Sequence, residues 1–435
     1  MPRPLAPQAV APAPPRALAA PPPSPGAYMH LEPRMSNVHP SHAQDVSPFP
    51  HRSRVELHAS RTLMTHMTKR TCKRNQLRLS CLCAFLLNFC KSDVNQSELS
   101  SCVASGFGRW LEDSSLKEPY LLSPTLYTPA FFTSRWFWGS CDHEKILHYY
   151  KSPNLLPVRR ELQYSWQPNC SHLLQGSSLP SYSQLRREFC SVFRGRSILF
   201  VGDSLSGQFF SSFISIFGVQ WATVNNASEN GCYLGFSATN FWKEVLNNAH
   251  EIDAEARICK SGELDVKVRF MRNDWLSTGD LTRVNGVSCD WFTVASDYDI
   301  FILNRGIHFV DDEVFAIQLQ ETLTNLRHLK NTARVIYRGS HHSTPNCAEL
   351  RDPQPTPLSS PNDTVSLSYH WDRTEIQNQI ARVLVEKIGG TFIGTFFAFS
   401  LRPGGRRLPD CLHFCLPSPM DEFVRVLLAY LIKSE

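Results

Sequence analysis

The sequence lacks an apolar run long enough to cross a bilayer comfortably, and its globular part lacks an excess of positive charge. The apolar core that follows its basic stretch runs only from Leu79 to Cys90, whereas a membrane span needs roughly 20 residues. The 435-residue chain carries 44 Lys and Arg against 39 Asp and Glu, yet residues 92–435 carry 32 against 36. A slightly acidic globular part is a poor nucleic-acid binder, so we expect no nucleic-acid partner.

Closely spaced metal ligands are also missing. The 14 cysteines include no CxxC pair, and no cluster of His, Asp and Glu has ligand spacing, so we expect no metal site. The ten cysteines after residue 93 are scattered singly. An even number at such spacing favours disulfides in an oxidising compartment over zinc, with a connectivity that sequence does not reveal. Sequons of the form N-x-[ST] also suit a glycoprotein of the secretory pathway; they begin at Asn95, Asn169, Asn226 and Asn362.

Composition divides the chain into unequal parts. Residues 1–50 hold 14 of the 30 prolines and few large apolar residues, so we expect a disordered segment over 1–66. The rest is rich in apolar and aromatic residues and too long for one small core. We therefore expect one large domain at 93–435, without internal repeats.

Between these parts lies a segment with the order of a targeting signal. A basic stretch precedes the apolar core at 79–90, as in a secretory signal or signal anchor, which we place at 67–92. Such signals stand at the very N-terminus, so one interpretation is that translation starts at Met64 or Met67. The alternative is a short buried helix behind a disordered tail.

Apolar runs in the domain predict buried strands, and helical patterns fall between them. The predicted strands are 197–201, 264–271, 298–304, 333–338 and 390–399. Strands that alternate with helices indicate a mainly parallel sheet covered on both faces. The predicted fold class is therefore a disulfide-stabilised three-layer α/β/α sandwich.

Three segments repeat apolar residues at helical spacing: the segment after Ser204, residues 311–331 and residues 372–390. Their apolar positions are Phe209, Phe213, Ile216 and Phe217 in the first, Leu319, Leu323 and Leu326 in the second, and Ile376, Ile380, Val383 and Leu384 in the third. The third helix has Asp372 as its expected N-cap and Gly389 or Gly390 as its end.

The strand at 197–201 leads into Gly202-Asp203-Ser204, where the first helix begins. Ligands of open α/β sheets bind outside the carboxyl ends of the strands. At a helix N-terminus the backbone N–H groups point towards a developing negative charge, so Ser204 can be a nucleophile with part of its oxyanion hole already built. The alternative is that Asp203 or Ser204 only caps the helix. The segment is not a G-x-S-x-G elbow, because position 206 is serine.

A serine nucleophile needs a base, and the base needs an orienting partner. Asp410 and His413 stand three residues apart near the C-terminus, so in a turn both side chains can fall on one side. An Asp that accepts from one ring nitrogen would leave the other nitrogen directed at Ser204. Cys411 and Cys415 would hold this loop. The alternative is that Asp410 caps and His413 is an ordinary surface residue.

Together these motifs resemble a known family. GDS after a strand, with D-x-x-H near the C-terminus, is similar to the SGNH (GDSL-like) esterase superfamily. More narrowly, the chain resembles the PC-esterase group that contains the trichome birefringence-like polysaccharide O-acetyltransferases. The narrower match rests on "YSWQPNCSHL" (164–173), "YDIFILNRGIHF" (298–309) and, most specifically, "DCLHFCLPSPMDEF" (410–423). It spans roughly residues 130–433, including an N-terminal family segment at about 130–190.

The resemblance implies a role for each matching residue. Ser204 is the expected nucleophile, His413 the general base and Asp410 its orienter. Asn304, with the backbone N–H of Ser204, is the expected oxyanion-hole donor; the alternative is that it only caps its strand. Arg305 is expected either to contact substrate or to brace Asn304.

Other positions match the family less closely. Like Arg305, His308 is expected either to contact substrate or to brace Asn304. The stretch "YRGSHHSTPNC" (337–347) suggests His342, or else His341, as a further substrate contact. Gly207-Gln208 replaces the family's Arg-Asn, so a contact at the helix start is missing or replaced. Gly231 and Gly235 are the candidates for a second oxyanion-hole glycine.

The implied activity is transfer of an acetyl group to hydroxyls of a cell-wall or secreted polysaccharide by double displacement. No cofactor is expected to stay bound; acetyl-CoA or an acetylated intermediate would be the donor, and a polysaccharide the acceptor. The implied location is the Golgi, as a type II protein anchored by residues 79–90, or outside the cell.

Two alternatives remain open. With water as acceptor, the same fold would be a carbohydrate acetyl esterase. A non-catalytic polysaccharide-binding protein would instead use aromatic side chains for sugar stacking, among them Trp136, Phe137, Trp138 and Trp166.

Overall fold

The computed structural model of the protein describes residues 96–113, 160–174, 179–219, 223–224, 231–234, 252–259, 265–279, 286–308, 310–363, 366–367, 369–406 and 411–435. All of them belong to the unit Gln76–Glu435. The Pro-rich segment predicted at 1–66 and the signal or anchor predicted at 67–92 lie outside the described residues. Within the described ranges, no helix is both long and apolar enough to span a bilayer.

A seven-stranded sheet forms the centre of this unit, in the order β11-β10-β9-β3-β7-β6-β4. Five neighbouring strands, β11, β10, β9, β3 and β7, are parallel. At the other edge β6 pairs antiparallel with β7, and β4 pairs antiparallel with β6. Their bounds are β3 Ser197–Gly202, β4 Thr223–Val224, β6 Asp253–Ile258, β7 Val266–Arg272, β9 Ile300–Leu303, β10 Arg334–Arg338 and β11 Thr391–Ile393. The prediction of a mainly parallel sheet is confirmed.

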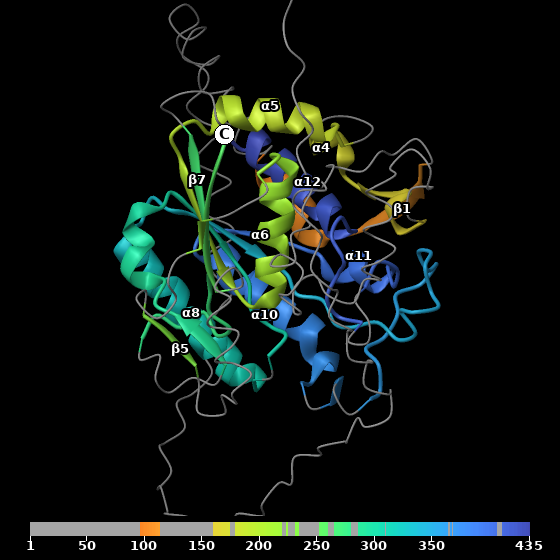
Figure 1. Ribbon diagram of the computed structural model, residues 1–435. Coiled ribbons are helices and arrows are strands. Elements are labelled where there is room, and N and C mark those ends of the chain that lie inside the picture. The colour runs from red at the N-terminus through yellow and green to blue at the C-terminus, as the bar shows by residue number, and fades with distance from the viewer. Residues whose placement is uncertain are drawn as a thin grey trace, which may run out of the picture. The chain divides into compact units, whose positions relative to one another are not determined.

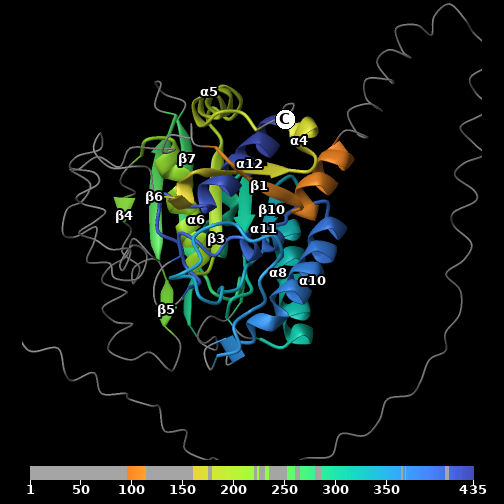
Figure 2. The ribbon, with the colours of Figure 1, turned by 90° about the vertical axis from the view of Figure 1, so that its right-hand side faces the viewer.

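Alternate residues of the strands build two separate cores. In β3, Ile198 and Phe200 belong to one apolar cluster, whereas Leu199 and Val201 belong to the other. The first cluster is completed by α5 (Tyr182–Val192), α6 (Ser204–Ile216) and α12 (Met420–Lys433), and the second by α8 (Asp312–Leu329) and α10 (Thr374–Lys387). Helix α5 lies above α6 in Figure 1, and α8 and α10 lie side by side in Figure 2. Two helical layers on one sheet confirm the three-layer α/β/α prediction.

Smaller elements surround the sheet. Two antiparallel pairs are formed by β1 (Gly108–Glu112) with β2 (Tyr164–Pro168), and by β5 (Cys232–Leu234) with β8 (Val287–Cys289). The short helices are η2 Arg160–Leu162, α4 Ser171–Leu174, η5 Phe292–Asp297, η6 Trp371–Arg373 and α11 Phe396–Ser400.

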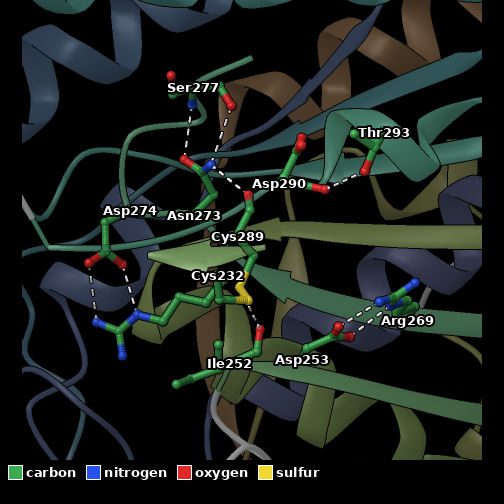
Figure 3. Close-up of a disulfide and its surroundings, with 11 residues drawn as sticks. Cys232, Ile252, Asp253, Arg269, Asn273, Asp274, Ser277, Cys289, Asp290 and Thr293 are labelled. Carbon is green, nitrogen blue, oxygen red and sulfur yellow. Dashed lines mark hydrogen bonds and ion pairs between the residues drawn. A yellow bond between two sulfur atoms is a disulfide. The ribbon is translucent and has the colours of Figure 1, made fainter. Parts of the chain in front are cut away.

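Four disulfides cross-link the described part of the chain, as the scattered cysteines predicted. They are Cys102–Cys170, Cys190–Cys259, Cys232–Cys289 and Cys347–Cys411. Figure 3 shows Cys232–Cys289 with Asn273, whose side chain donates to the carbonyl oxygens of Cys289 and Ser277. Because such bonds persist in oxidising compartments, they indicate a protein of the secretory pathway.

Three local predictions are wrong. The run 390–399 is a strand only as far as Ile393, and its second half is the helix α11. Helix α10 begins at Thr374 after the 3₁₀ turn η6, so Asp372 is not its N-cap. The third, the buried face of α10, is wrong only in part. Ile380 and Leu384 pack against the second core as predicted, whereas Val383 is exposed and Gln377 and Asn378 are buried.

The buried amides of α10 explain that difference. Asn378 accepts from the N–H of Ser340 and donates to its carbonyl oxygen, both at 2.8 Å. Gln377 donates to the carbonyl oxygen of Val310 at 2.9 Å. These bonds satisfy loop backbone that apolar side chains would leave unpaired, which accounts for two buried amides on this helix.

Helix α12 was not predicted, and it is buried along nearly its whole length. Its acidic residues hold other elements: Glu422 accepts from the N–H of Trp166 and the hydroxyl of Tyr182, both at 2.8 Å. Trp166, considered for sugar stacking, is 2% exposed and packs against Phe423. It is therefore a core residue, and the other three aromatics proposed with it lie outside the described residues.

Candidate active site

The structure brings the predicted nucleophile and base together. Ser204 is the first residue of α6 and follows β3 at the carboxyl edge of the sheet. The Nε2 atom of His413 lies 2.8 Å from the Oγ atom of Ser204, across a sequence separation of 209 residues. This is the hydrogen-bond distance at which an imidazole removes a proton from a serine. Asp410, the predicted orienter, lies outside the described residues.

Asp203, not Ser204, caps the helix. Its Oδ1 atom accepts from the N–H groups of Leu205 at 2.9 Å and Ser206 at 3.4 Å. The cap therefore leaves the hydroxyl of Ser204 to His413. Burial raises the pKa of the Asp203 carboxyl, and the nearby charges of His308 and Arg338 act in the opposite direction.

The backbone N–H of Ser204, the predicted oxyanion-hole donor, stands at the N-terminus of α6. None of the described hydrogen bonds uses it, whereas the next three N–H groups of the helix are directed to Asp203. Gly202 makes this sharp exit from β3 sterically feasible. A Cβ atom there would lie 2.3 Å from the Oγ atom of Ser206 and 2.5 Å from the carbonyl oxygen of Asn304, closer than any real contact.

Asn304 links the ends of β9 and β10 to helix α6. Its Nδ2 group donates to the carbonyl oxygen of Arg338 and to the hydroxyl of Ser340, both at 2.8 Å. Its Oδ1 atom accepts from the guanidinium of Arg338 at 2.6 Å and from Ser206 at 3.2 Å. Both amide hydrogens are thus donated within the protein in this conformation. The oxyanion-hole role stays a prediction that requires one of these bonds to open.

The loop that carries His413 is fastened at every neighbouring residue. The bond Cys347–Cys411 holds its start, and the carbonyl oxygen of Leu412 accepts from Arg406 at 2.7 Å and contacts a ring nitrogen of His341 at 3.3 Å. The guanidinium of Arg406 also lies 4.1 Å from the ring centroid of Phe414. Farther on, the N–H of Cys415 donates to the carbonyl oxygen of Gly405 at 2.9 Å. These contacts fix the backbone from which the imidazole projects.

Gln208 links this loop directly to α6. Its Nε2 group donates to the carbonyl oxygen of Phe414 at 2.8 Å, and its Oε1 atom accepts from the N–H of Phe414 at 3.1 Å. Gln208 lies one helical turn after Ser204, and Phe414 follows His413. The sequence had shown only that Gly207-Gln208 departs from the family pattern. The structure shows that Gln208 makes a bidentate contact with Phe414 at this position.

The three residues predicted to contact substrate differ in how far they are buried. Arg305 is 1% exposed, and its guanidinium donates to Gln318 at 2.6 Å between the rings of Trp275 and Phe315. Arg305 therefore packs against the second core, and its Nε and Nη1 groups are buried without a hydrogen-bond partner among the described residues. A contact with substrate stays a prediction. Burial lowers the pKa of Arg305 to about 10, so it stays charged at neutral pH.

His342 is also buried, with its ring edge against Phe396 and its Nδ1 atom at the carbonyl oxygen of Ser343. It therefore supports the loop rather than lining an open site. His308 is partly exposed, and its Nε2 atom lies 3.7 Å from the Oδ2 atom of Asp274. Of the three predicted contacts, only His308 is open to a ligand.

The role of the two candidate oxyanion-hole glycines stays a prediction. Gly231 leads into β5 and accepts from the N–H of Asp290, and Gly235 lies outside the described residues. Within the ranges given above, no group of three or more His, Cys, Asp or Glu side chains is placed to hold a metal ion.

Fold and site thus define an α/β protein with a serine–histidine pair at the carboxyl edge of a parallel sheet. No family model matches the chain. Over 351 residues, which are 75% of this chain and 88% of the relative, the sequence is 27% identical to protein trichome birefringence-like 42 of Arabidopsis thaliana. The resemblance inferred from the motifs is confirmed by this relative.

Solved structures with a similar arrangement include two that concern acetyl groups. One, of a peptidoglycan O-acetylesterase, is 11% identical over 58% of this chain and 94% of that chain, with a TM-score of 0.32. The other, the periplasmic domain of a lipopolysaccharide acetyltransferase of Salmonella ser. Paratyphi A, is 13% identical over 59% and 91%, with a TM-score of 0.31. At these TM-scores the likeness carries no argument about the activity of this chain.

Proposed function

We propose that the protein is a serine-dependent O-acetyltransferase that acts on hydroxyl groups of a polysaccharide in the secretory pathway. The observation that carries the proposal is the 2.8 Å contact between Ser204 and His413 at the N-terminus of α6. The similarity to a trichome birefringence-like protein supports it. Residence in the Golgi is part of the proposal.

The first half-reaction loads the serine. His413 Nε2 takes the proton of Ser204 as Oγ attacks the acetyl carbonyl carbon of the donor. The N–H of Ser204, at the positive end of α6, stabilises the resulting oxyanion. The intermediate then collapses: the bond to the donor's leaving group breaks, that group takes the proton from His413, and acetyl-Ser204 remains. Acetyl-CoA or another acetyl ester or thioester supplies the acetyl group.

The second half-reaction returns the enzyme to its starting state. A sugar hydroxyl gives its proton to His413 and attacks the acetyl-serine carbonyl. The second intermediate releases the acetylated sugar, and Ser204 recovers its proton from His413. Water in place of the sugar would give free acetate, which is the activity of an esterase. In both half-reactions Asp410 is proposed to orient the imidazole.

The test uses the full chain produced in a secretory host. Wild type, Ser204→Ala and Ser211→Ala are incubated with ¹⁴C-acetyl-CoA or 4-nitrophenyl acetate, with and without oligosaccharide acceptors. Ser211 is a suitable control because it lies on the same helix and is likewise half-buried. We expect label on Ser204 and on sugar with wild type and Ser211→Ala, and on neither with Ser204→Ala. Release of acetate regardless of the sugar would identify an esterase, and absence of both products would contradict the proposal.

A further inference from the structure

A small aromatic stack stands beside the serine–histidine pair and has no part in the mechanism above. Its inner member is Trp371, which is 5% exposed and packs with Leu205, Ile307 and Leu412 in a cluster separate from the two main cores. Leu205 follows Ser204, and Leu412 precedes His413. Trp371 therefore shares an apolar cluster with the sequence neighbours of both Ser204 and His413.

The outer member of the stack is open. The ring of Tyr369 lies nearly parallel to that of Trp371, at an interplanar angle of 17° and a centroid distance of 5.7 Å. Tyr369 is 42% exposed, although its neighbour beneath is buried. A large aromatic ring supported on one side and open elsewhere is a platform for a flat apolar ligand face.

The inner ring of the stack is held in place. The indole N–H of Trp371 donates to the carbonyl oxygen of Ile307 at 3.1 Å, which fixes the inner ring to the loop after β9. Residues 371–373 form η6, and the N–H of Arg373 donates to the carbonyl oxygen of His370 at 2.9 Å. A platform fixed before binding loses little conformational entropy when a ligand arrives.

A polar group borders the platform. The rings of His308 and Tyr369 are roughly perpendicular, with an interplanar angle of 78° and 6.2 Å between centroids. Its side chain is 23% exposed although its Nε2 atom is buried beside Asp274, so the exposed atoms belong to the rest of the ring. A partly exposed imidazole next to an aromatic face offers a hydrogen bond at the rim of an apolar surface.

We propose that Tyr369, Trp371 and His308 form a subsite that binds one pyranose ring of the acceptor next to Ser204. The C–H face of a pyranose is flat and apolar, whereas its edge carries hydroxyl groups. Tyr369 covers the face, and His308 binds a hydroxyl at the edge. Ligand sites generally combine aromatic surface with a few placed polar groups in this way. The subsite deepens the function proposed above and rests on it for the identity of the acceptor.

The test measures sugar binding without turnover, so that it stands even if acetyl transfer is not found. All variants are made in the full chain carrying Ser204→Ala. Binding of xylohexaose, cellohexaose and mannohexaose is measured by titration calorimetry for this parent, Tyr369→Ala, Tyr369→Phe and Tyr233→Ala. Tyr233 is the matched control, because it is 46% exposed and lies on β5.

We expect Tyr369→Ala to raise the Kd of the sugar that binds by about 2- to 12-fold, the range for loss of one aromatic contact. Tyr369→Phe keeps the ring and should retain most of the affinity, and Tyr233→Ala should equal the parent. In the Ser204 enzyme, the same change at Tyr369 should raise KM for the sugar more than it lowers kcat. Equal binding by Tyr369→Ala and the parent overturns the subsite, and so does failure of the parent to bind any of the three sugars at millimolar concentration. Loss of acetyl transfer with sugar binding intact would instead count only against the proposed function.

Discussion

Gln208 and Phe414 are joined by a pair of hydrogen bonds that ties the helix of Ser204, the proposed nucleophile, to the loop of His413, the proposed base. The side-chain amide of Gln208 donates to the carbonyl oxygen of Phe414 and accepts from its N–H. Residues four apart on a helix share one face, so Gln208 lies on the same face of α6 as Ser204, one turn later. These two hydrogen bonds therefore help to fix the distance between Ser204 on α6 and His413 on the loop.

Gln208→Ala should remove this alignment. Displacement of a reacting group by about 1 Å can cost 10²-fold in rate, so we expect kcat for acetyl ester hydrolysis to fall by about 10- to 100-fold, with little change in KM. The unpaired N–H and carbonyl of Phe414 should also lower the free energy of unfolding by about 1–3 kcal/mol. Steady-state kinetics and urea denaturation measure the two effects.

The control for that experiment is Gln184→Ala. Gln184 is also a helical glutamine, but its amide contacts only Glu188 on the surface of α5 among the described side chains. Its removal should leave both quantities within error. If Gln208→Ala kept the full kcat, the disulfide and Arg406 alone would be sufficient to position His413.

Asn304→Ala separates a structural role from an oxyanion role. Its buried amide satisfies Ser206, Arg338 and Ser340, so the truncation should lower the free energy of unfolding by about 3 kcal/mol. Loss of an oxyanion donor alone would cost about 10²–10³ in kcat and leave stability unchanged. Denaturation and kinetics of the same variant decide between them; a stable, slow enzyme would restore the oxyanion prediction.

The disulfide Cys347–Cys411 should matter for both folding and activity. It closes a loop of 64 residues, so replacing both cysteines with alanine should lower the free energy of unfolding by about 4 kcal/mol. Because Cys411 lies two residues before His413, kcat should fall as well. The matched control is Cys190–Cys259, which closes 69 residues between α5 and the end of β6. Its removal should cost similar stability but spare kcat at a temperature where the protein stays folded; equal loss of kcat in both variants would contradict this.

His342 should make stability depend on pH. Burial lowers the pKa of His342 to about 4 from an ordinary value of 6.5, opposed by its contact with the carbonyl oxygen of Ser343. Between these values the unfolded chain binds a proton that the folded protein does not. Stability is therefore highest above pH 6.5 and falls towards pH 4, by about 1.4 kcal/mol per pH unit for this group.

The variant His342→Asn tests this sign. It removes one titrating group, so the slope of the free energy of unfolding between pH 6 and pH 4.5 should decrease by about 1.4 kcal/mol per unit. His341 is also buried, with its pKa lowered well below 6.5, and serves as the second site for comparison. An unchanged slope in His342→Asn would mean that His342 binds its proton in the folded protein too.

Part of the site could be predicted because it depends on local chemistry. A buried strand that ends in Gly-Asp-Ser before an apolar-spaced helix predicts a serine at the carboxyl edge of a parallel sheet, and β3 and α6 place it there. The C-terminal D-x-x-H motif predicts the base, and His413 reaches Ser204. Both predictions use short spacings, over which the backbone fixes side-chain direction.

Other features depended on contacts that sequence spacing does not encode. The apolar positions of α10 predicted a buried face containing Val383, but the amides of Gln377 and Asn378 are buried because loop backbone required partners. The motif left Arg305 either a substrate contact or a bracing role, and the structure shows its buried guanidinium 5.1 Å from the ring centroid of Trp275 beside the second core. A polar side chain is buried where backbone groups of distant segments need a hydrogen-bond partner, and the spacing of residues along the chain does not reveal those places.

By itself, the sequence determined the alternation of strands and helices and the presence of disulfides, and it singled out Ser204 and His413, which the structure brings into contact. These follow from periodicity, cysteine spacing and motifs, all of which are local along the chain. Only the tertiary structure decided that Asp203 is the cap, that Gln208 holds the loop of the base, and that Tyr369 lies on Trp371 beside the reacting pair. The contact of Gln208 with the loop and the position of the stack beside Ser204 and His413 join segments far apart in the chain. The choice between Asp203 and Ser204 as the cap also needed the tertiary structure, in which the Ser204 hydroxyl contacts His413, 209 residues away.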